Sequence, residues 1–423
     1  MSRPEILAPA GDFTCLQAAI DAGADAVYFG LGTFNMRARS GVNFKAGDLP
    51  EIARRCESPG AGRAPVRRYL ALNAIMFEDE VGDVERTILE AKPYVDAFIV
   101  SDWGVISLCR RHGARFHVST QMSTSNSEAV RFLASQGAER VVLARECTLA
   151  EVKRIAGASP IEIECFVHGA QCVAESGRCF MSHDIFGKSA CRGECVQPCR
   201  RQFVVKAVDF YVDGSGEPVH EGRTEFVVEP HTVLSAKDLC SLGFVDRLMD
   251  AGIASFKIEG RARNAEYVKT TVSCYRRAVD AVLAGTYSKE LAEELTVEVK
   301  KVFHREFADG LYFGRPGAHQ FADSEDSLST TVKRHVGIVI DYYQKAKIAQ
   351  VKVQDHSLSV GDTVQIQGPT TGVQEFTVGE LRRDEESPAT AEKGTWVTLK
   401  APRCRVGDKV FYVETRNANQ EGR

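Results

Sequence analysis

At 423 residues, the chain is too long for one ordinary core and has room for a large domain and a smaller one. Its 44% hydrophobic and 26% charged residues are ordinary for a soluble globular protein, and a net charge of −4 argues against a protein that coats itself in nucleic acid. No run approaches the roughly 18 apolar residues of a membrane span, and the N-terminus lacks the pattern of a signal peptide. We therefore expect a cytoplasmic protein with no membrane partner.

Short apolar strands alternate with amphipathic helical patterns up to about residue 330. A strand at 5–10 precedes a helix at 15–23 that ends on Gly23. Further strands are predicted at 25–31, 68–77, 96–102, 115–121, 140–146, 161–169 and 255–261. This alternation is typical of βα units in a parallel sheet. Because no glycine-rich dinucleotide motif follows the first strand, the α/β fold predicted is a closed (β/α)8 barrel of the TIM type, spanning residues 1–330.

A long segment separates the seventh and eighth predicted strands. It leaves from the carboxyl end of a strand, so we expect residues 170–234 to form an insertion over the barrel mouth. Residues 205–233 alternate in the manner of a β-hairpin that turns around Asp213–Gly216. A loop of this length in a compact domain is usually functional.

A second, strand-rich domain is predicted over 331–423. The pattern strand–Val-Gly-Asp–strand occurs twice, with its turns at 360–362 and 406–408, and indicates a small C-terminal β-barrel. It resembles the second domain of translation elongation factors, so RNA binding is one possible role for it. A helical bridge over 265–310, including acidic helices at 288–308, is expected to join the two domains.

Five of the thirteen cysteines lie in the insertion, and four of them are spaced C-x6-C-x15-C-x3-C: Cys172, Cys179, Cys195 and Cys199. In a cytosolic chain, such clustering indicates a metal site or thiol chemistry rather than disulfides. Cys191 lies four residues before Cys195 and is a reserve. The isolated cysteines are expected to be small buried hydrophobic residues: Cys15, Cys56, Cys109, Cys147, Cys165, Cys274 and Cys404.

The spacing leaves three kinds of site open. Structural zinc is usually bound by pairs of cysteines about two to four residues apart, and Cys172 and Cys179 are too widely separated for that. The C-x3-C-x2-C motif of radical-SAM enzymes is absent. An iron–sulfur cluster accepts four thiolates at irregular spacing and is favoured, with zinc and thiol chemistry as the alternatives.

The insertion also carries a resemblance to a known family. Residues 164–182, ECFVHGAQCVAESGRCFMS, resemble the signature of peptidase family U32, the collagenase-like family. The blocks GECVQPCR, SAKDLC and FKIEGRARNAEYV match further parts of that family, as do residues 7–31 and 34–44. The resemblance covers about residues 5–285.

This resemblance implies an oxygen-independent hydroxylase with a 4Fe-4S cluster. Carried onto the matching positions, its ligands would be Cys172, Cys179, Cys195 and Cys199, with Cys191 and Cys240 in reserve. Some relatives hydroxylate ubiquinone precursors, which are small molecules. Others form 5-hydroxyuridine at the tRNA wobble position or 5-hydroxycytidine in large-subunit ribosomal RNA, and these depend on prephenate, a dicarboxylate, as the source of the hydroxyl oxygen.

The C-terminal domain makes the RNA-modifying branch the better match, because the short ubiquinone-pathway members lack it. Relatives that act on ribosomal RNA carry longer extensions, so a tRNA hydroxylase is expected first and a ribosomal RNA hydroxylase second. A peptidase is the alternative of another class. The chain contains neither H-E-x-x-H nor G-x-S-x-G, although a cysteine nucleophile paired with His168 stays open.

Hydroxylation without oxygen needs groups that bind a dicarboxylate and groups that move protons. Arginine binds carboxylates bidentately, and four arginines are predicted at or just beyond strand ends: Arg37, Arg39, Arg145 and Arg261. Each can instead form a structural ion pair. His168 is a candidate proton carrier, or else a hydrogen-bonding partner of the cysteine loop. Three further strand-end residues are candidates, Glu259 for catalysis and substrate orientation, and Asn73 and Gln121 for substrate binding.

Overall fold

The computed structural model describes residues 3–32, 34–38, 43–60, 62–203, 206–212, 215, 218–225, 234–314, 320–322, 324 and 326–416. Its largest sheet contains eight parallel strands in which each strand pairs with the next. They are β1 (Glu5–Pro9), β2 (Ala26–Gly30), β3 (Arg67–Leu72), β4 (Ala97–Val100), β5 (Phe116–Val118), β6 (Arg140–Val142), β7 (Glu162–Gly169) and β11 (Ser255–Ile258). Strand β11 pairs with both β7 and β1, which closes the barrel and confirms all eight predicted strands.

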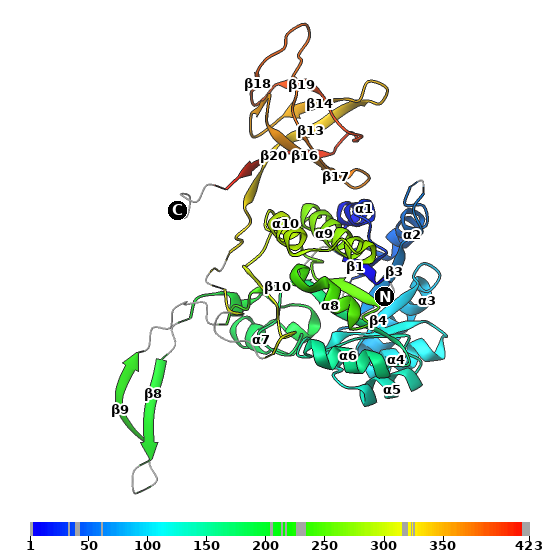
Figure 1. The fold of residues 1–423 in the computed structure, drawn as a ribbon, viewed down its shortest axis with the longest axis vertical. Helices are drawn as coiled ribbons and strands as arrows, with labels where there is room; N and C mark the ends of the chain where they lie inside the picture. Colours follow the sequence, from blue (N-terminus) through cyan, green and yellow to red (C-terminus); the bar gives the residue numbers. More distant parts are fainter. Residues whose placement is uncertain are drawn as a thin grey trace.

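Helices surround this barrel (Figure 1). They are α1 (Phe13–Asp21), α2 (Leu49–Glu57), α3 (Val81–Ala91), α4 (Trp103–Arg111), α5 (Ser127–Ser135), α6 (Leu149–Ala158), α8 (Val245–Asp250) and α9 (Ala265–Ala284). Short 3-10 helices accompany them: η1 (Ala46–Asp48), η2 (Glu78–Glu80), η3 (Thr120–Met122) and η6 (Leu242–Phe244).

Residues close to the helix ends in the sequence determine where the helices begin. Asp12 caps α1 by accepting a hydrogen bond from the backbone N–H of Cys15, and Thr148 and Glu151 form a capping box on α6.

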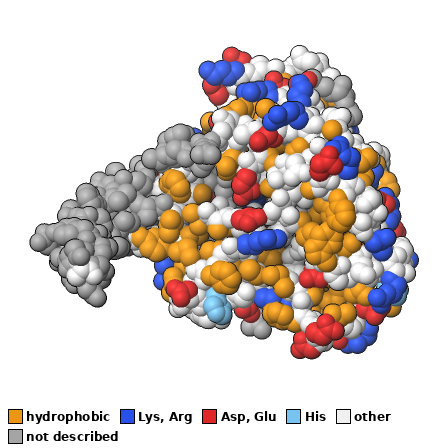
Figure 2. Space-filling model, turned by 90° about the horizontal axis from the view of Figure 1, so that it is seen from below, with side chains coloured by type: hydrophobic (Ala, Val, Ile, Leu, Met, Phe, Trp, Pro, Cys, Tyr) orange, Lys and Arg blue, Asp and Glu red, His pale blue; other side chains and the backbone are white. Residues whose placement is uncertain are grey.

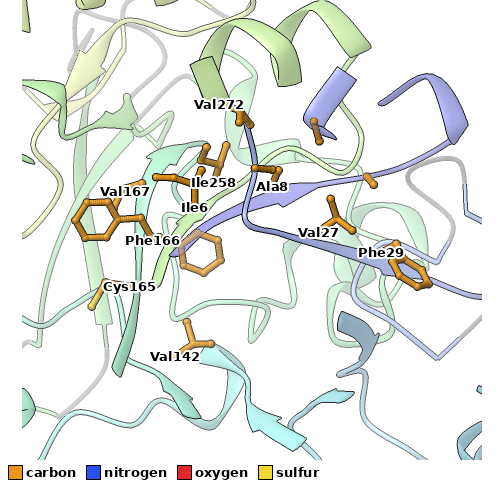
Figure 3. Close-up of a cluster of buried hydrophobic side chains, with 14 of the residues drawn as sticks. Ile6, Ala8, Val27, Phe29, Val142, Cys165, Phe166, Val167, Ile258 and Val272 are labelled. Carbon is orange, nitrogen blue, oxygen red and sulfur yellow. The ribbon is translucent and has the colours of Figure 1, made fainter. Parts of the chain in front are cut away.

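The hydrophobic core has two layers because side chains alternate along each strand. On β1, Ile6 and Ala8 pack outward against the helices, whereas Leu7 points into the barrel beside Tyr28. Figure 3 shows part of the outer layer, where Ile6, Ile258 and Val272 lie together. All seven isolated cysteines are buried, as predicted.

The surface itself carries mixed charge. On the face in Figure 2, Lys and Arg side chains are interspersed with Asp and Glu. None of the helices in the described part of the chain has the length and apolar character that crossing a bilayer requires.

The predicted insertion follows β7. It contains α7 (Met181–Phe186), η4 (Ala190–Arg192), η5 (Pro198–Arg200) and an antiparallel hairpin of β8 (Lys206–Val212) and β9 (Pro218–Glu225). The hairpin is confirmed, although most of its predicted turn at 213–216 and residues 226–233 lie outside the described residues. The chain then returns through β10 (Asp238–Cys240), which pairs antiparallel with the end of β7 and parallel with β12 (Phe307–Ala308).

The C-terminal domain is strand-rich, as expected, with antiparallel pairing, and begins at β13 (Thr331–Tyr343). Its six-stranded sheet has the order β17-β16-β20-β13-β14-β19 and a hydrophobic core separate from that of the barrel. The strands are β14 (Ile348–Val353), β16 (Thr363–Gly368), β17 (Gly372–Thr377), β19 (Trp396–Lys400) and β20 (Lys409–Thr415), with β15 (Leu358–Ser359) and β18 (Thr390–Ala391) forming a second small sheet.

The two Val-Gly-Asp turns are built alike. Gly361 and Gly407 have φ angles of +94° and +88°, a conformation that glycine adopts without steric cost. Asp362 accepts a hydrogen bond from the backbone N–H of Ser359 at 2.7 Å, and Asp408 accepts one from Arg405 at the same distance. The repeat seen in the sequence is therefore a repeated turn structure.

The segment predicted as a helical bridge belongs in part to the barrel. Helix α9 packs against α1 and β1, which completes the ring of helices, and α10 (Lys289–Val299) packs on α9. The C-terminal domain packs against α1 and α9 through β17. Lys269 on α9 donates a hydrogen bond to the carbonyl of Val373 at 2.7 Å, and Lys333 forms an ion pair with Glu266 at 2.7 Å.

An ion network fills the barrel interior below the mouth. Arg140 and Glu164 are each 1% exposed and lie 3.1 Å apart, and Lys257 contacts Glu164 at 2.7 Å. Burial opposes ionisation of Glu164, but Lys257 and Arg140 outweigh it and lower the pKa of this carboxyl to about 2. A buried charge without its partner is strongly destabilising, so each member of the network depends on the others.

We predict that Glu164→Gln lowers the free energy of unfolding at pH 7 by about 3–5 kcal/mol, because it leaves Lys257 and Arg140 without their shared carboxylate. Glu162, whose side chain is 50% exposed, also contacts Arg140, and Glu162→Gln should cost less than about 1 kcal/mol. Urea unfolding measures both variants. Equal losses would contradict the buried network.

The same pair has a defined pH dependence. Since the folded-state pKa of Glu164 lies below the unfolded value of 4.5, its contribution is complete above that value and is lost as the pH falls toward 2. The difference in stability between the wild type and Glu164→Gln should therefore shrink on acidification.

Candidate functional site

A cavity of about 150 Å³ lies at the carboxyl ends of the barrel strands, beneath the insertion. Its floor comes from β2, β3, β4, β5, β7 and β11 and from the residues that follow them. Its roof is made by residues 170–200 of the insertion. In barrels of this type, the carboxyl ends of the strands carry the chemistry. The insertion therefore covers the place where an active site is expected.

All four cysteines singled out from the sequence line this cavity: Cys172, Cys179, Cys195 and Cys199. Burial raises the pKa of Cys199, which Arg200 opposes, and the other three thiols are close enough to raise it further. The two reserves lie elsewhere. Cys191 is not on the cavity wall, and Cys240 is buried in β10 beside Tyr275, where burial raises its pKa to about 11.

Arg200 fixes the two ends of the cysteine-bearing segment to each other. Its buried guanidinium donates to the carbonyl of Gln171 at 2.5 Å, to the carbonyl of Ala236 and to the hydroxyl of Ser235 at 3.2 Å. Gln171 immediately precedes Cys172, and Arg200 immediately follows Cys199. This one side chain therefore fixes the positions of two of the four thiols relative to the barrel.

Two glycines let the roof approach the barrel loops closely. A Cβ atom on Gly177 would lie 2.4 Å from the side chain of Met36, and one on Gly193 would lie 2.3 Å from the carbonyl oxygen of Asn35. Both glycines have positive φ angles. The insertion thus packs on the segment that contains Arg37.

The opposite wall is basic. Arg37 forms an ion pair with Glu259 at 2.6 Å, although the two residues are 222 positions apart in the sequence. Burial opposes ionisation of Glu259, but Arg37 and Arg145 outweigh it and lower its pKa to about 2. Near neutral pH, Glu259 is therefore ionised and can accept a proton but not donate one.

Two more arginines share this wall. Arg145 lies over the ring of Phe166, 3.9 Å from its centroid, and donates to the carbonyl of Ala170 at 2.6 Å. Arg261 is buried and donates to Asn35 at 2.9 Å, and burial lowers its pKa to about 10, which keeps it protonated at neutral pH. Three arginines thus share this wall with one carboxylate, Glu259. The excess positive charge suits an anion.

A polar amide cluster completes the floor. Asn73 donates to the hydroxyl of Ser119 and to the side-chain oxygen of Gln121, both at 3.1 Å. It also accepts a hydrogen bond from the backbone N–H of Met36 at 3.3 Å. The structure therefore brings together Asn73, Gln121, Arg37, Arg145, Arg261 and Glu259 as the sequence suggested, whereas Arg39 lies outside the described residues.

His168 is not brought into the cavity. It is buried beside Tyr267, Tyr275 and Phe307, and burial lowers its pKa to about 3. The reason is a β-bulge, because Lys257 pairs with Phe166 while the next residue of β11, Ile258, pairs with His168. The extra residue reverses the alternation of side chains, so Phe166 faces the cavity and His168 does not.

Sequence reasoning missed several residues of the wall: Tyr28, Ser119, Ser182, Arg200 and Lys257. Ser182 could have been found, because it ends the motif S-G-R-C-x-x-S. Its hydroxyl lies 3.8 Å from the sulfur of Cys195 and accepts a hydrogen bond from the backbone N–H of Val196 at 3.2 Å. Lys257 was not singled out from the sequence, and the structure buries it at the cavity floor.

The donor set is one that an iron–sulfur cluster could use. Four thiols face one cavity that no described histidine lines, and thiolates are the usual ligands of such clusters. Among the described residues, no three Cys, His, Asp or Glu side chains converge as a single-ion site would require. Zinc holds its sulfur ligands at about 2.3 Å, which places the sulfurs close together, whereas a four-iron cluster holds its ligands farther apart.

Comparison with known proteins gives a family match. The family model described as peptidase family U32 matches residues 11–321. This range includes every described residue of the cavity wall.

Three relatives carry names that refer to different activities. A protein named collagenase from Porphyromonas gingivalis is 37% identical, with 97% of this chain and 98% of that protein covered. The tRNA hydroxylation protein P1 of Bacillus subtilis is 33% identical over 89% of this chain and 85% of its own length. The 23S rRNA 5-hydroxycytidine C2501 synthase of Escherichia coli is 34% identical over 81% of this chain and 50% of its own length.

The close approach of Gly193 to the barrel can be tested by substitution. We predict that Gly193→Ala costs about 1–2 kcal/mol for the left-handed backbone plus about 1–3 kcal/mol for the contact with Asn35. Gly187 also has a positive φ, of +65°, but no atom lies close to where its Cβ would be. Gly187→Ala should therefore show only the cost of the left-handed backbone. Urea unfolding measures both costs, and cleavage by trypsin reports release of the insertion. Identical behaviour would mean that the insertion does not press on the barrel in solution.

Proposed function

Because the chain belongs to peptidase family U32, and because four thiols and a group of three arginines on the opposite wall line one cavity, we propose that it is an iron–sulfur-dependent RNA hydroxylase that needs no oxygen. Its first substrate is tRNA, in which it forms 5-hydroxyuridine at the wobble position. The relative named as a tRNA hydroxylation protein supports this choice, since the alignment covers 85% of that protein. The convergence of thiols and arginines is the observation that carries the proposal.

The thiols of Cys172, Cys179, Cys195 and Cys199 are assigned as the ligands of a 4Fe-4S cluster. Such a cluster, when bound, supplies electron transfer or Lewis acidity beside the substrate. Burial raises the pKa of the Cys199 thiol, and the positive charge of the neighbouring Arg200 offsets part of this effect.

The three arginines are assigned to the oxygen donor. Replacing C5–H of a pyrimidine by C5–OH removes two electrons from the base, so the donor accepts two electrons as its carbon–oxygen bond breaks. Prephenate is the donor we name, and its two carboxylates match the charge that Arg37, Arg145 and Arg261 leave after pairing with Glu259. Glu259 orients Arg37 and can accept a proton.

The amide cluster is assigned to the base. Asn73 and Gln121 present side-chain amides at the cavity floor, and amides pair with the edge of a pyrimidine through both donors and acceptors. One nucleotide, taken out of its stack, is assigned to the cavity.

Two alternatives remain distinct. Hydroxylation of a cytidine in ribosomal RNA is favoured by the relative named for that reaction, but this chain spans half of that protein's length. A peptidase is favoured by the relative named collagenase. Against a cysteine peptidase, no histidine among the described residues lines the cavity, and a thiol nucleophile needs such a base.

Metal content tests the cluster. Protein purified without oxygen should be brown and contain about four iron and four sulfide ions per chain. Changing any of the four assigned cysteines to serine should lower the iron content, whereas Cys191→Ser should retain it because Cys191 lies off the cavity. Iron and sulfide assays with absorbance spectra measure this. A colourless, zinc-loaded protein would contradict the proposal.

Nucleoside analysis tests the substrate. Deleting the gene should remove 5-hydroxyuridine and nucleosides derived from it from bulk tRNA, and a Cys179→Ala copy should fail to restore them. The Cys191→Ser copy serves as the matched control and should restore them. Unchanged tRNA with altered ribosomal RNA would select the ribosomal alternative, and no change in either RNA would refute RNA hydroxylation.

A further inference from the structure

Four large apolar side chains of the insertion are exposed to solvent. Their exposed fractions are 76% for Phe180, 52% for Ile185, 40% for Phe186 and 40% for Val196. We call these four residues the insertion rim. Clustered exposed apolar side chains mark interaction sites more often than single ones do. Hydrophobic side chains also gather in patches on the face that Figure 2 shows.

The insertion rim adjoins the cavity. Phe180 directly follows Cys179, and Val196 directly follows Cys195, and both cysteines face the cavity. Met181 and Ser182, at the start of α7, also belong to its wall. A molecule bound on the rim would therefore lie next to the cavity, because rim residues and cavity-lining residues are direct neighbours in the sequence.

Two more exposed apolar side chains lie on a barrel loop that contacts the insertion. Ile75 and Phe77, which follow β3, are 48% and 56% exposed. The backbone N–H of Ile75 donates to the carbonyl of Cys191 at 3.4 Å, which joins this loop to the insertion. Arg192 lies over the ring of Phe77, 4.7 Å from its centroid, and also pairs with Glu80.

Cations accompany these rings. Arg201 is exposed and lies 5.1 Å from the ring centroid of Phe186. Arg178 and Lys188 are exposed as well, and none of the three has a carboxylate partner in the part of the chain that the structure describes. Residues 170–203 carry five Lys or Arg against three Asp or Glu, whereas the whole chain has a net charge of −4. The region around the rim is thus locally basic.

Exposed aromatic rings beside cations without carboxylate partners suit single-stranded nucleic acid. Bases stack on aromatic faces, and phosphates pair with Arg and Lys. A protein partner with an apolar patch would pack against the rings, but it would not account for the exposed cations. An RNA duplex would use the cations but keeps its bases out of reach of the rings.

We propose that the insertion rim binds unpaired RNA nucleotides, with Phe180 and Phe186 stacking bases and Arg178, Lys188 and Arg201 contacting phosphates. This inference rests on the proposed function and adds to it the surface that holds the nucleotides next to the one inside the cavity. It also explains why the rings stay exposed beside the thiols.

Binding measurements on the full-length, anaerobically purified protein test the rim. The probe is an unmodified, fluorescently labelled tRNA anticodon stem-loop, compared with the same strand paired to its complement. Phe180→Ala and Phe186→Ala should each weaken stem-loop binding by about tenfold or more and leave duplex binding unchanged. Phe132 on α5 is 54% exposed and packs against Trp103, and Phe132→Ala should bind like the wild type.

Salt dependence gives a second readout. Arg201→Gln should reduce the slope of log affinity against log salt by about 0.7, the change expected for one lost phosphate contact to a single strand. Iron content and thermal stability of all variants should match the wild type, because these side chains lie on the surface. Unchanged stem-loop affinity in the Phe180 and Phe186 variants would assign the rim to a protein partner and overturn the proposal.

The two proposals fail separately. If stem-loop binding by the purified protein depends on Phe180 but gene deletion leaves tRNA and ribosomal RNA unchanged, the rim proposal stands and RNA hydroxylation is refuted. If the Cys179→Ala strain lacks 5-hydroxyuridine but Phe180→Ala leaves stem-loop affinity unchanged, the proposed hydroxylase function stands and the rim proposal is refuted.

Discussion

The pairing of β11 with both β7 and β1 is the constraint on which the site depends. These hydrogen bonds close the barrel and bring residue 259 next to residue 37, across 222 positions of sequence. Closure also fixes where β7 ends, and with it the place from which the insertion starts. Without it, the arginines at the strand ends would not face one cavity, and the thiols would have no floor opposite them.

Charge balance explains the division of the barrel interior into two levels. Below, Glu164 pairs with Lys257 and Arg140, and Glu5 also pairs with Arg140, so the buried charges balance in a network that stabilises the fold. Above, Glu259 is the only carboxylate that the described residues contribute to a wall with Arg37, Arg145 and Arg261. The lower level is complete in itself, whereas the upper level keeps positive charge for a ligand. The same strands therefore carry a balanced ion network at one end and, at the other, an excess of positive charge that would suit an anion.

The roof joins two kinds of surface in one short segment. Its inner side presents the thiols, and its outer side presents exposed rings such as Phe180 and Phe186. Glycines 177 and 193 allow it to lie directly on the barrel loops, and Arg200 fastens its ends. A chemistry that needs both a protected centre and a large substrate would suit this arrangement, with one nucleotide inside the cavity and the rest of the polymer outside it.

The sequence by itself determined the eight strands, the small antiparallel domain and the four cysteines. Strand periodicity, turn residues and cysteine spacing are local patterns, and local patterns survive in the linear chain. Tertiary structure alone decided that Arg37 pairs with Glu259, that Lys257 lies inside the barrel and that His168 faces away from the cavity. These outcomes depend on strand register and on one bulge in β7, where a single extra residue reverses which side chains face inward.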